Sequence, residues 1–260
     1  MHMESIQFEL IGQVGMITLN RPQVYNAFNR EMALALQSRL DQCAADDGIR
    51  AVLLTGAGKA FCAGQDLQEV VSENGPSLKV ILSEHYNPVI TRIRALEKPV
   101  VAAVNGVAAG AGANIALACD VVVATESASF IQAFSKIGLI PDSGGTYHLP
   151  RLIGWQRASA LMMTGDKIAA REALSMGMLY RVLPDESFAE EALKLAGRLA
   201  EMPTRALALT KKALNGSLEN NLDQQLILED RLQSEAGATD DYREGVAAFL
   251  EKRPARFKGK

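Results

Sequence analysis

This 260-residue sequence contains few cysteines and few aromatic residues, and neither sign of charge is in large excess. The three cysteines are an odd number without CxxC spacing, which gives no basis for a disulfide framework or a zinc cluster. The 27 basic and 30 acidic residues leave a net charge of −3. Phosphate-backbone binding needs clustered Lys and Arg, so we expect no nucleic-acid partner. Only 5% of the residues are aromatic whereas 21 are glycine, so backbone turns are expected to matter more than stacking platforms.

The sequence also lacks a recognisable targeting signal. The first residues do not form a basic segment followed by an apolar one, as a signal peptide would. A reducing cytoplasm is therefore the expected location. Residues 100–124 are long and apolar enough to imitate a membrane span, but Asn105, Asn114 and Asp120 would then lie unpaired in hydrocarbon. Two β-branched runs around a glycine-rich middle instead predict strand, turn, buried helix and strand. We therefore expect no membrane partner.

Strand and helix signals alternate in the first half of the chain, which is typical of an α/β protein. Apolar and polar residues alternate over 6–10 and 14–19, as in a hairpin. Asn29 is placed to cap an amphipathic helix over 30–44. Short apolar runs predict buried strands over 51–55, 100–104 and 121–124.

Beyond Tyr147 the pattern becomes mostly helical, with one further strand predicted over 178–183. We therefore predict an α/β core over 1–195 and a helical oligomerisation region over 196–260. Helices are predicted over 155–164, 169–176, 187–202, 204–215, 221–236 and 240–251.

The segment PDSGG (141–145) imitates the nucleophile segment of chymotrypsin-like serine proteases. That mechanism needs a histidine base and a buried acid to orient it, and His85 and His148 are the only internal histidines. A helix-rich cytoplasmic scaffold also differs from a disulfide-bonded β-barrel. Serine hydrolysis is therefore disfavoured, and no His, Asp or Glu grouping has the spacing of a metal site.

Two glycine-rich segments each lead from a strand into a helix. FCAGQDL (61–67) places Asp66 three residues before Glu69, which fits a capping box, while NGVAAGAGA (105–113) has no large side chain near its turn. The start of a helix presents free backbone N–H groups that can bind developing negative charge. One donor from each turn converging on a carbonyl oxygen would form an oxyanion hole.

Asp142 is the other carboxylate of interest. The local sequence favours a turn or helix-capping aspartate. Its neighbours are apolar and uncharged, however, and a carboxyl group in such a pocket would hold a proton more readily than in water. The second interpretation would make Asp142 a proton shuttle.

The wider pattern of the chain then becomes recognisable in six stretches. These are LNRP (19–22), FCAGQDL (61–67), KPVVAAVNGVAAGAG (98–112), ACDVVVA (118–124), FSKIGLIPDSGGTYHLPRLIG (134–154) and TGDKIAAREALSMGMLYRVLP (164–184). Together they resemble the crotonase (enoyl-CoA hydratase/isomerase) superfamily over nearly the whole chain. The resemblance implies an α/β fold, a crotonase-like spiral of ββα turns with a C-terminal helical trimerisation region. It also implies a homotrimer or dimer of trimers and an acyl-CoA thioester substrate. Coenzyme A is part of that substrate, so no separate cofactor is expected.

The resemblance also assigns site residues. Gln65 and Ala111 match the positions whose backbone N–H groups bind the thioester oxygen, and Tyr86 is a candidate for the acyl pocket. Phe249 and Lys252 match C-terminal positions that often reach coenzyme A near a subunit boundary. The expected substrate and coenzyme A contacts are Gln23, Val24, Tyr25, Ala63, Gly64, Gln65, Asp66, Leu67, Gly110, Ala111, Gly112, Asn114, Phe134, Tyr86, Phe249 and Lys252.

Two departures from the hydratase pattern indicate the reaction. Enoyl-CoA hydratases carry two glutamates that together activate water, and Asn114 and Phe134 stand at the matching positions here. Asp142 matches the catalytic aspartate of several isomerases and dehalogenases of the superfamily. One carboxylate without a water-activating partner suits proton transfer between carbons of an enolate. A hydratase, a hydrolase with Asp142 as nucleophile and a non-catalytic acyl-CoA-binding protein remain as alternatives.

Within the superfamily, FCAGQDL, YNP (86–88), NGVAAGAGA, AFSKIGLIPD, DQQL (223–226) and DYREGVAAFL (241–250) are similar to isomerases of bacterial phenylacetate catabolism. Those relatives convert the ring epoxide of 2-(1,2-epoxy-1,2-dihydrophenyl)acetyl-CoA to an oxepin and also shift double bonds in enoyl-CoA substrates. A general Δ3,Δ2-enoyl-CoA isomerase is the broader alternative.

Overall fold

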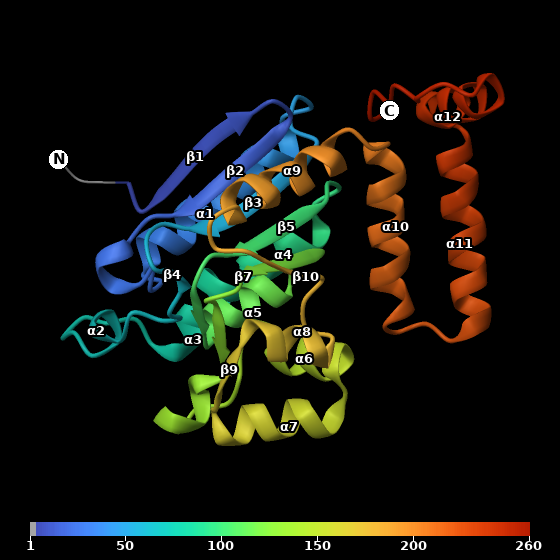
Figure 1. Cartoon of the computed structure of the whole chain (residues 1–260). Coiled ribbons are helices and arrows are strands. Elements are labelled where there is room, and N and C mark those ends of the chain that lie inside the picture. The colour runs from blue at the N-terminus through green and yellow to red at the C-terminus, as the bar shows by residue number, and fades with distance from the viewer. Residues whose placement is uncertain (1–3) are drawn as a thin grey trace.

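Ten strands form two sheets in the computed structural model, which describes residues 4–260 (Figure 1). Residues 1–3, the start of the predicted core, lie outside the described residues. The larger sheet has the order β1-β2-β3-β5-β7-β10 and the smaller one the order β4-β6-β8-β9. The strands are β1 (Ile6–Ile11), β2 (Val14–Leu19), β3 (Ala51–Gly56), β4 (Ala60–Cys62), β5 (Val100–Val104), β6 (Val107–Ala109), β7 (Val121–Thr125), β8 (Ser129–Ile131), β9 (Lys167–Ala169) and β10 (Arg181–Leu183).

The larger sheet begins with the predicted hairpin, since β1 and β2 pair antiparallel from Ile6 opposite Leu19 to Ile11 opposite Val14. From β2 onward the sheet is parallel, and β3, β5 and β7 are buried on both faces over most of their length. Such strands are continuous apolar runs rather than alternating ones. This explains why the sequence pattern revealed β3, β5 and β7.

A repeated unit connects the two sheets. In each of the pairs β3–β4, β5–β6 and β7–β8, the first strand joins the larger sheet and the second joins the smaller one after a short turn. β4, β6 and β8 are three residues long, and the sequence pattern did not predict them because a three-residue strand carries no measurable alternation. The chain therefore spirals through ββ turns that are followed by helical segments.

The helices include every one that the periodicity predicted, with boundaries within two residues. They are α1 (Arg30–Ala45), α2 (Leu67–Val70), α3 (Leu78–Val80), α4 (Asn87–Ala95), α5 (Ala111–Leu117), α6 (Gly145–Ile153), α7 (Trp155–Thr164), α8 (Ala170–Met176), α9 (Phe188–Ala200), α10 (Thr204–Ser217), α11 (Leu222–Gly237) and α12 (Asp240–Glu251). Two 3₁₀ segments, η1 (Pro22–Val24) and η3 (Ala133–Ile137), and a π-helical segment, η2 (Ile81–Tyr86), complete the set. Asn29 caps α1 as expected, because its side chain accepts a hydrogen bond from Met32 N at 3.0 Å.

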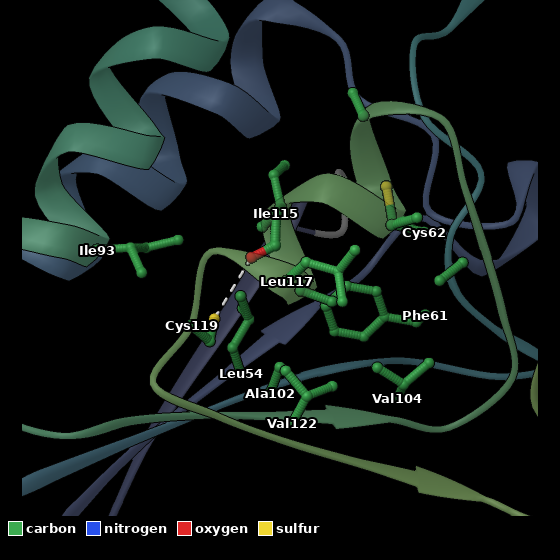
Figure 2. Packing of buried hydrophobic residues seen from close by; sticks show 14 of the residues in the cluster. Leu54, Phe61, Cys62, Ile93, Ala102, Val104, Ile115, Leu117, Cys119 and Val122 are labelled. Carbon is green, nitrogen blue, oxygen red and sulfur yellow. Dashed lines mark hydrogen bonds between the residues drawn. The ribbon is translucent and has the colours of Figure 1, made fainter. Parts of the chain in front are cut away.

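The main hydrophobic core lies between α5 and the larger sheet (Figure 2). Leu117 of α5 is directed toward Ala102 of β5 and Val122 of β7, whereas Ile115 points to the other side of α5, away from the sheet. All seven residues of α5 are buried, so small side chains are needed wherever its backbone approaches a neighbour. This packing positions the first residue of α5 at the site described below.

A second core lies on the opposite face of the larger sheet. Phe188, Ala192, Ala196 and Ala200 of α9 recur on one helical face and pack against the sheet. α9 thus remains on the sheet through Ala200. The division into a core and an oligomerisation region at 195/196 stays a prediction. Helices α10, α11 and α12 then extend away from the sheets (Figure 1).

Residues 100–124 form β5, β6, α5 and the first part of β7, as the sequence predicted. No helix among residues 4–260 combines the length and the apolar character that a membrane crossing requires. Within the same described range, no group of three or more His, Cys, Asp or Glu side chains is placed to hold a metal ion.

Candidate active site

A cavity of about 700 Å³ opens between the two glycine-rich turns, η2, η3 and the loop before α6. Its wall is mostly aliphatic, and the predicted residues that line it are Ala63, Gly64, Gln65, Leu67, Tyr86, Gly110, Ala111, Phe134 and Asp142. A cavity of this size and lining is typical of a small-molecule site with a few placed polar groups.

The two glycine-rich turns are in direct contact. Gly64 has φ +91° and Gly110 has φ +52°, and both are left-handed values that side chains disfavour. A Cβ atom on Gly64 would lie 3.0 Å from the Ala109 carbonyl oxygen and 3.6 Å from Ala111 N. Glycine at position 64 therefore lets the main chain before α2 approach the start of α5.

Each turn leaves one backbone donor at the cavity. Among residues 4–260, neither Gln65 N–H nor Ala111 N–H donates to a protein acceptor. Ala111 is the first residue of α5, where an amide has no partner within the helix. An oxyanion hole requires two such N–H groups beside one cavity, so this geometry is compatible with the predicted one.

Side-chain hydrogen bonds hold Gln65 in place. Tyr86 Oη donates to Gln65 Oε1 at 3.0 Å, and Gln65 Nε2 donates to Glu69 Oε2 at 3.0 Å. The other carboxylate oxygen of Glu69 accepts a hydrogen bond from Arg30 N at 2.9 Å. Tyr86 is 1% exposed, and burial raises the pKa of its hydroxyl, so the hydroxyl stays a donor.

The predicted capping box at Asp66 forms only in part. The Asp66 side chain accepts a hydrogen bond from Gln68 N at 3.1 Å and pairs with Arg21 at 2.9 Å. Glu69 does not return a bond to Asp66 N, because that amide donates to Phe28 O and the Glu69 carboxylate is used by Gln65 and Arg30 N. Glu69 thus connects the turn to α1 instead of closing the box.

Asp142 is the only acidic residue that lines the cavity in the described part of the chain. Burial raises the pKa of its carboxyl, while a hydrogen bond donated by Ser143 Oγ to Asp142 Oδ1 at 2.8 Å opposes that rise. The main chain is fixed as well, since Asp142 O accepts hydrogen bonds from Gly145 N and Asn114 Nδ2, both at 2.8 Å. The raised pKa agrees with the apolar environment that the sequence indicated.

The two residues at the hydratase glutamate positions have different roles. Asn114 is fully buried and lies behind the cavity wall, where it supports the Asp142 backbone and accepts from Gln132 Nε2 at 2.8 Å. Phe134 lines the cavity, and its ring lies 3.7 Å from the position of a Cβ on Gly110. An aromatic ring therefore stands at the turn that leads into α5.

The segments expected to hold coenzyme A lie side by side. Ala63 N donates to Tyr25 O at 3.0 Å, Phe28 N donates to Gly64 O at 2.7 Å, and Asp66 N donates to Phe28 O at 2.8 Å. Tyr25 is 57% exposed, and its carbonyl oxygen bonds to Ala63, so its ring is accessible to solvent next to the turn at Gly64. The structure thus brings residues 23–25 and 63–67 together.

Some expected contacts lie outside the cavity. Gly112 packs against Cys62, where a Cβ would come within 2.5 Å of Cys62 O, so its role is close packing. Phe249 and Lys252 lie at the end of α12, and Phe249 lines a separate depression of about 460 Å³ with residues of α10 and α11. Their contact with coenzyme A stays a prediction that depends on a neighbouring subunit.

Sequence patterns did not reveal several residues of the site. Gln132 donates to Asn114, which only the folded chain brings close to it, and Ser143 donates to the side chain of its sequence neighbour Asp142, a bond that no sequence pattern predicts. Part of the aliphatic wall also gave no periodic signal, namely Leu78 of α3 and Ile81 and Leu82 of η2. The rest of that wall, Ile137, Leu139 and Ile140, consists of the apolar neighbours of Asp142 that the sequence indicated.

Comparison with known proteins agrees with this geometry. The profile described as enoyl-CoA hydratase/isomerase matches residues 9–260. The chain is 51% identical over 247 residues to the 1,2-epoxyphenylacetyl-CoA isomerase of Escherichia coli K12, covering 94% of each chain. It is 47% identical over 260 residues to a probable enoyl-CoA hydratase of Rhodobacter capsulatus, covering 100% of each. An enoyl-CoA hydratase crystal structure from Geobacillus kaustophilus superposes with a TM-score of 0.92 at 38% identity, with 98% of both chains covered.

The chain belongs to the enoyl-CoA hydratase/isomerase family and has the crotonase fold. The family and the fold that the sequence motifs implied are therefore confirmed. Membership makes an acyl-CoA thioester the substrate class.

Proposed function

We propose that the protein is an acyl-CoA isomerase that moves a proton between two carbons of a thioester enolate. The observation that carries this proposal is Asp142, the single acidic side chain lining the cavity among residues 4–260, beside two unpaired backbone donors. One carboxylate near an oxyanion hole supplies a base and, after protonation, an acid. It supplies no second group to activate water.

The proposed reaction of a 3-enoyl-CoA proceeds in two proton transfers. The Asp142 carboxylate takes a proton from C2, and the electrons of the broken C–H bond form an enolate whose charge develops on the thioester oxygen. Gln65 N–H and Ala111 N–H donate to that oxygen, and one such donor is worth about 3–4 kcal/mol at the transition state. The Asp142 carboxyl group then returns the proton at C4, which leaves a 2-enoyl-CoA and restores the carboxylate.

The surroundings of Asp142 support isomerisation over hydration. At the first hydratase glutamate position, the Asn114 side chain is hydrogen-bonded to Asp142 O and Gln132 Nε2. At the second position, Phe134 presents an apolar ring to the cavity. Because neither residue can deprotonate water, we expect hydration of 2-enoyl-CoA to be slow.

For the acyl group we propose the ring epoxide of 2-(1,2-epoxy-1,2-dihydrophenyl)acetyl-CoA, with 3-enoyl-CoA thioesters as further substrates. Support comes from the 51% identity to the E. coli 1,2-epoxyphenylacetyl-CoA isomerase and from the wide aliphatic cavity of about 700 Å³. The probable hydratase at 47% identity makes hydration the alternative to test.

One assay panel tests this proposal. Purified protein is given a 3-enoyl-CoA, a 2-enoyl-CoA and the epoxide thioester, and products are followed by liquid chromatography and mass spectrometry. We expect double-bond migration and oxepin formation, with little hydration.

Asp142→Asn should lower kcat about 10²- to 10⁴-fold while acyl-CoA binding is retained. Full activity in that variant would contradict the proposal, and vigorous hydration would favour the hydratase. A covalent adduct on Asp142 would indicate a hydrolase, and acyl-CoA binding without any turnover would indicate a non-catalytic protein.

We also propose assembly into homotrimers or dimers of trimers through the C-terminal helices. Exposed apolar side chains on α11 and α12 support this, including Ile227, which is 72% exposed, and Phe249, which is 83% exposed. Light scattering behind a sizing column should give three or six subunits. A monomer at micromolar concentration would contradict the assembly.

A further inference from the structure

Ser143 combines an unfavourable backbone conformation with almost complete burial. Its φ is +52°, in the left-handed region that favours glycine, and its exposure is 2%. Only Tyr25, Asn26 and Lys252 share a positive φ among the other non-glycine residues of the described chain. A left-handed conformation costs a serine on the order of 1 kcal/mol relative to glycine. A serine at this position is therefore explained only if its hydroxyl makes a useful interaction.

The hydroxyl of Ser143 serves Asp142. Ser143 Oγ donates to Asp142 Oδ1 at 2.8 Å, in the segment PDSGG that resembled a protease nucleophile loop. A serine nucleophile would instead donate to a histidine base. Both residues line the cavity, and the Asp142 main chain is already held by Gly145 N and Asn114 Nδ2. The Ser143 hydroxyl is therefore the group that restrains the Asp142 side chain.

We propose that Ser143 is a positioning residue for the proton shuttle, holding Oδ1 of Asp142 so that Oδ2 takes and returns the substrate proton. The inference rests on the proposed function of Asp142. The serine proton stays on Ser143 throughout. The substrate proton moves from C2 to Asp142 Oδ2 and then to C4, while the double bond shifts from C3=C4 to C2=C3. A donor to the ionised carboxylate is a charge-assisted hydrogen bond, about twice as strong as one between neutral groups.

The hydrogen bond also affects which protonation state is available. Burial raises the pKa of Asp142 and the Ser143 hydroxyl lowers it, so loss of the hydroxyl keeps the proton on Asp142 to higher pH. The titratable groups around Asp142 are Tyr86 of η2, Lys136 of η3 and His148 of α6. Burial raises the pKa of Tyr86 further above its ordinary value and lowers the pKa of His148 to about 4.

Two substitutions distinguish the effect of the Ser143 hydroxyl from the effect of its left-handed backbone conformation. Ser143→Ala removes the hydroxyl and keeps a side chain in the left-handed conformation, whereas Ser143→Gly removes the hydroxyl and relieves the backbone strain. We expect kcat on a 3-enoyl-CoA to fall about tenfold to a hundredfold in both variants. KM should change little, and the acid limb of the kcat/KM profile should move to higher pH in both.

Controls distinguish this role from a structural one. Thermal unfolding should show Ser143→Gly to be more stable than Ser143→Ala, while the shift of the acid limb is shared. His148→Gln should leave the limb in place, since the limb belongs to Asp142; a limb that disappears in that variant would overturn the assignment.

A near-wild-type kcat and an unmoved acid limb in Ser143→Gly would overturn the positioning role, because the serine would then matter only through its backbone. An active Asp142→Asn enzyme would instead overturn the proposed function itself. The two failures are therefore distinguishable.

Discussion

Asp142 shows how one residue trades stability for chemistry. Its carboxyl group lines an aliphatic cavity, where the charged form loses hydration, and a single hydroxyl donor offsets part of that loss. A raised pKa suits the proposed role, in which the group holds a substrate proton between two steps. The loss of hydration disfavours the charged carboxylate in the folded protein.

We therefore predict that Asp142→Asn is more stable than the wild type at pH 7. The folded-state pKa of Asp142 lies above its ordinary value of 3.8, so the folded protein binds more protons than the unfolded chain between the two pKa values. Stability from this group is present at acid pH and is lost as pH rises through the folded pKa. Asparagine carries no charge and avoids the loss, while its carbonyl can still accept from Ser143.

Chemical denaturation at pH 7 and at acid pH measures this effect. The advantage of Asp142→Asn should shrink as pH falls below the folded pKa of Asp142. Asp166→Asn, on the loop before β9, is a suitable exposed control and should show no such trend. A variant that is less stable than the wild type at pH 7 would contradict the desolvation argument.

At the scale of the element, α5 joins the core to the cavity. Its first residue, Ala111, has a backbone N–H that is unpaired within the described chain, and its later residues Ile115 and Leu117 are both buried in the core, with Leu117 directed toward the larger sheet. Close approach requires a missing side chain at Gly112, because a Cβ there would lie 2.5 Å from Cys62 O and 2.6 Å from Cys62 Sγ. Core packing and the proposed catalytic donor thus depend on the same short helix.

Two helical glycines should respond to alanine in opposite directions. Gly112→Ala forces α5 away from β4, which should destabilise the fold by about 1–3 kcal/mol and lower kcat through Ala111 N–H. Gly197 lies within α9, where an added methyl group would meet no neighbouring element within 4 Å, so Gly197→Ala should stabilise by about 0.5–1 kcal/mol. Denaturation midpoints and kcat of both variants test this contrast. Equal stability of the two would show that α5 can shift at little cost.

Elements that bury a regular face were predictable from the sequence, and the irregular ones were not. The 3.6-residue repeat predicted α7 and α12 at their observed bounds, and the apolar run predicted β5. The three-residue strands β4, β6 and β8 and the π-helical η2 have too few residues for a period. Most of the cavity backbone was predictable from glycine turns and family motifs. Gln132 was not, because its hydrogen bond joins it to Asn114 of another element, and the bond from Ser143 to its neighbour Asp142 depends on the left-handed backbone at Ser143.

At the scale of the whole molecule, buried cations join the C-terminal helices to the α/β part. Lys211 of α10 is 7% exposed and donates to Asp120 Oδ2 at 2.8 Å and to Ile93 O at 2.7 Å. Arg50, the residue before β3, is 5% exposed and donates to Thr204 at the start of α10. Because these cations are buried, their hydrogen-bond partners must replace the water that they lost on folding.

Arg50 satisfies three acceptors at once. Its Nε donates to Thr204 Oγ1 at 2.8 Å, and its two terminal nitrogens donate to Met202 O at 2.6 Å and Phe257 O at 2.9 Å. These acceptors lie before α10, at its start and in the tail after α12, so one guanidinium joins three segments to β3. A lysine has a single ammonium group and cannot reproduce the planar fork.

We predict that Arg50→Ala destabilises the protein by about 2–4 kcal/mol, and that Arg50→Lys recovers only part of the loss. The reason is that two backbone carbonyls and one hydroxyl lose their donor in a buried position, while the cavity is untouched. Thermal and denaturant unfolding measure the loss, and kcat of the folded protein should stay near the wild-type value. Arg198→Ala, an exposed arginine in the last turn of α9, should change stability by less than about 0.5 kcal/mol. If Arg50→Ala were as mild as that control, the attachment of the C-terminal helices would depend on Lys211 and apolar packing instead.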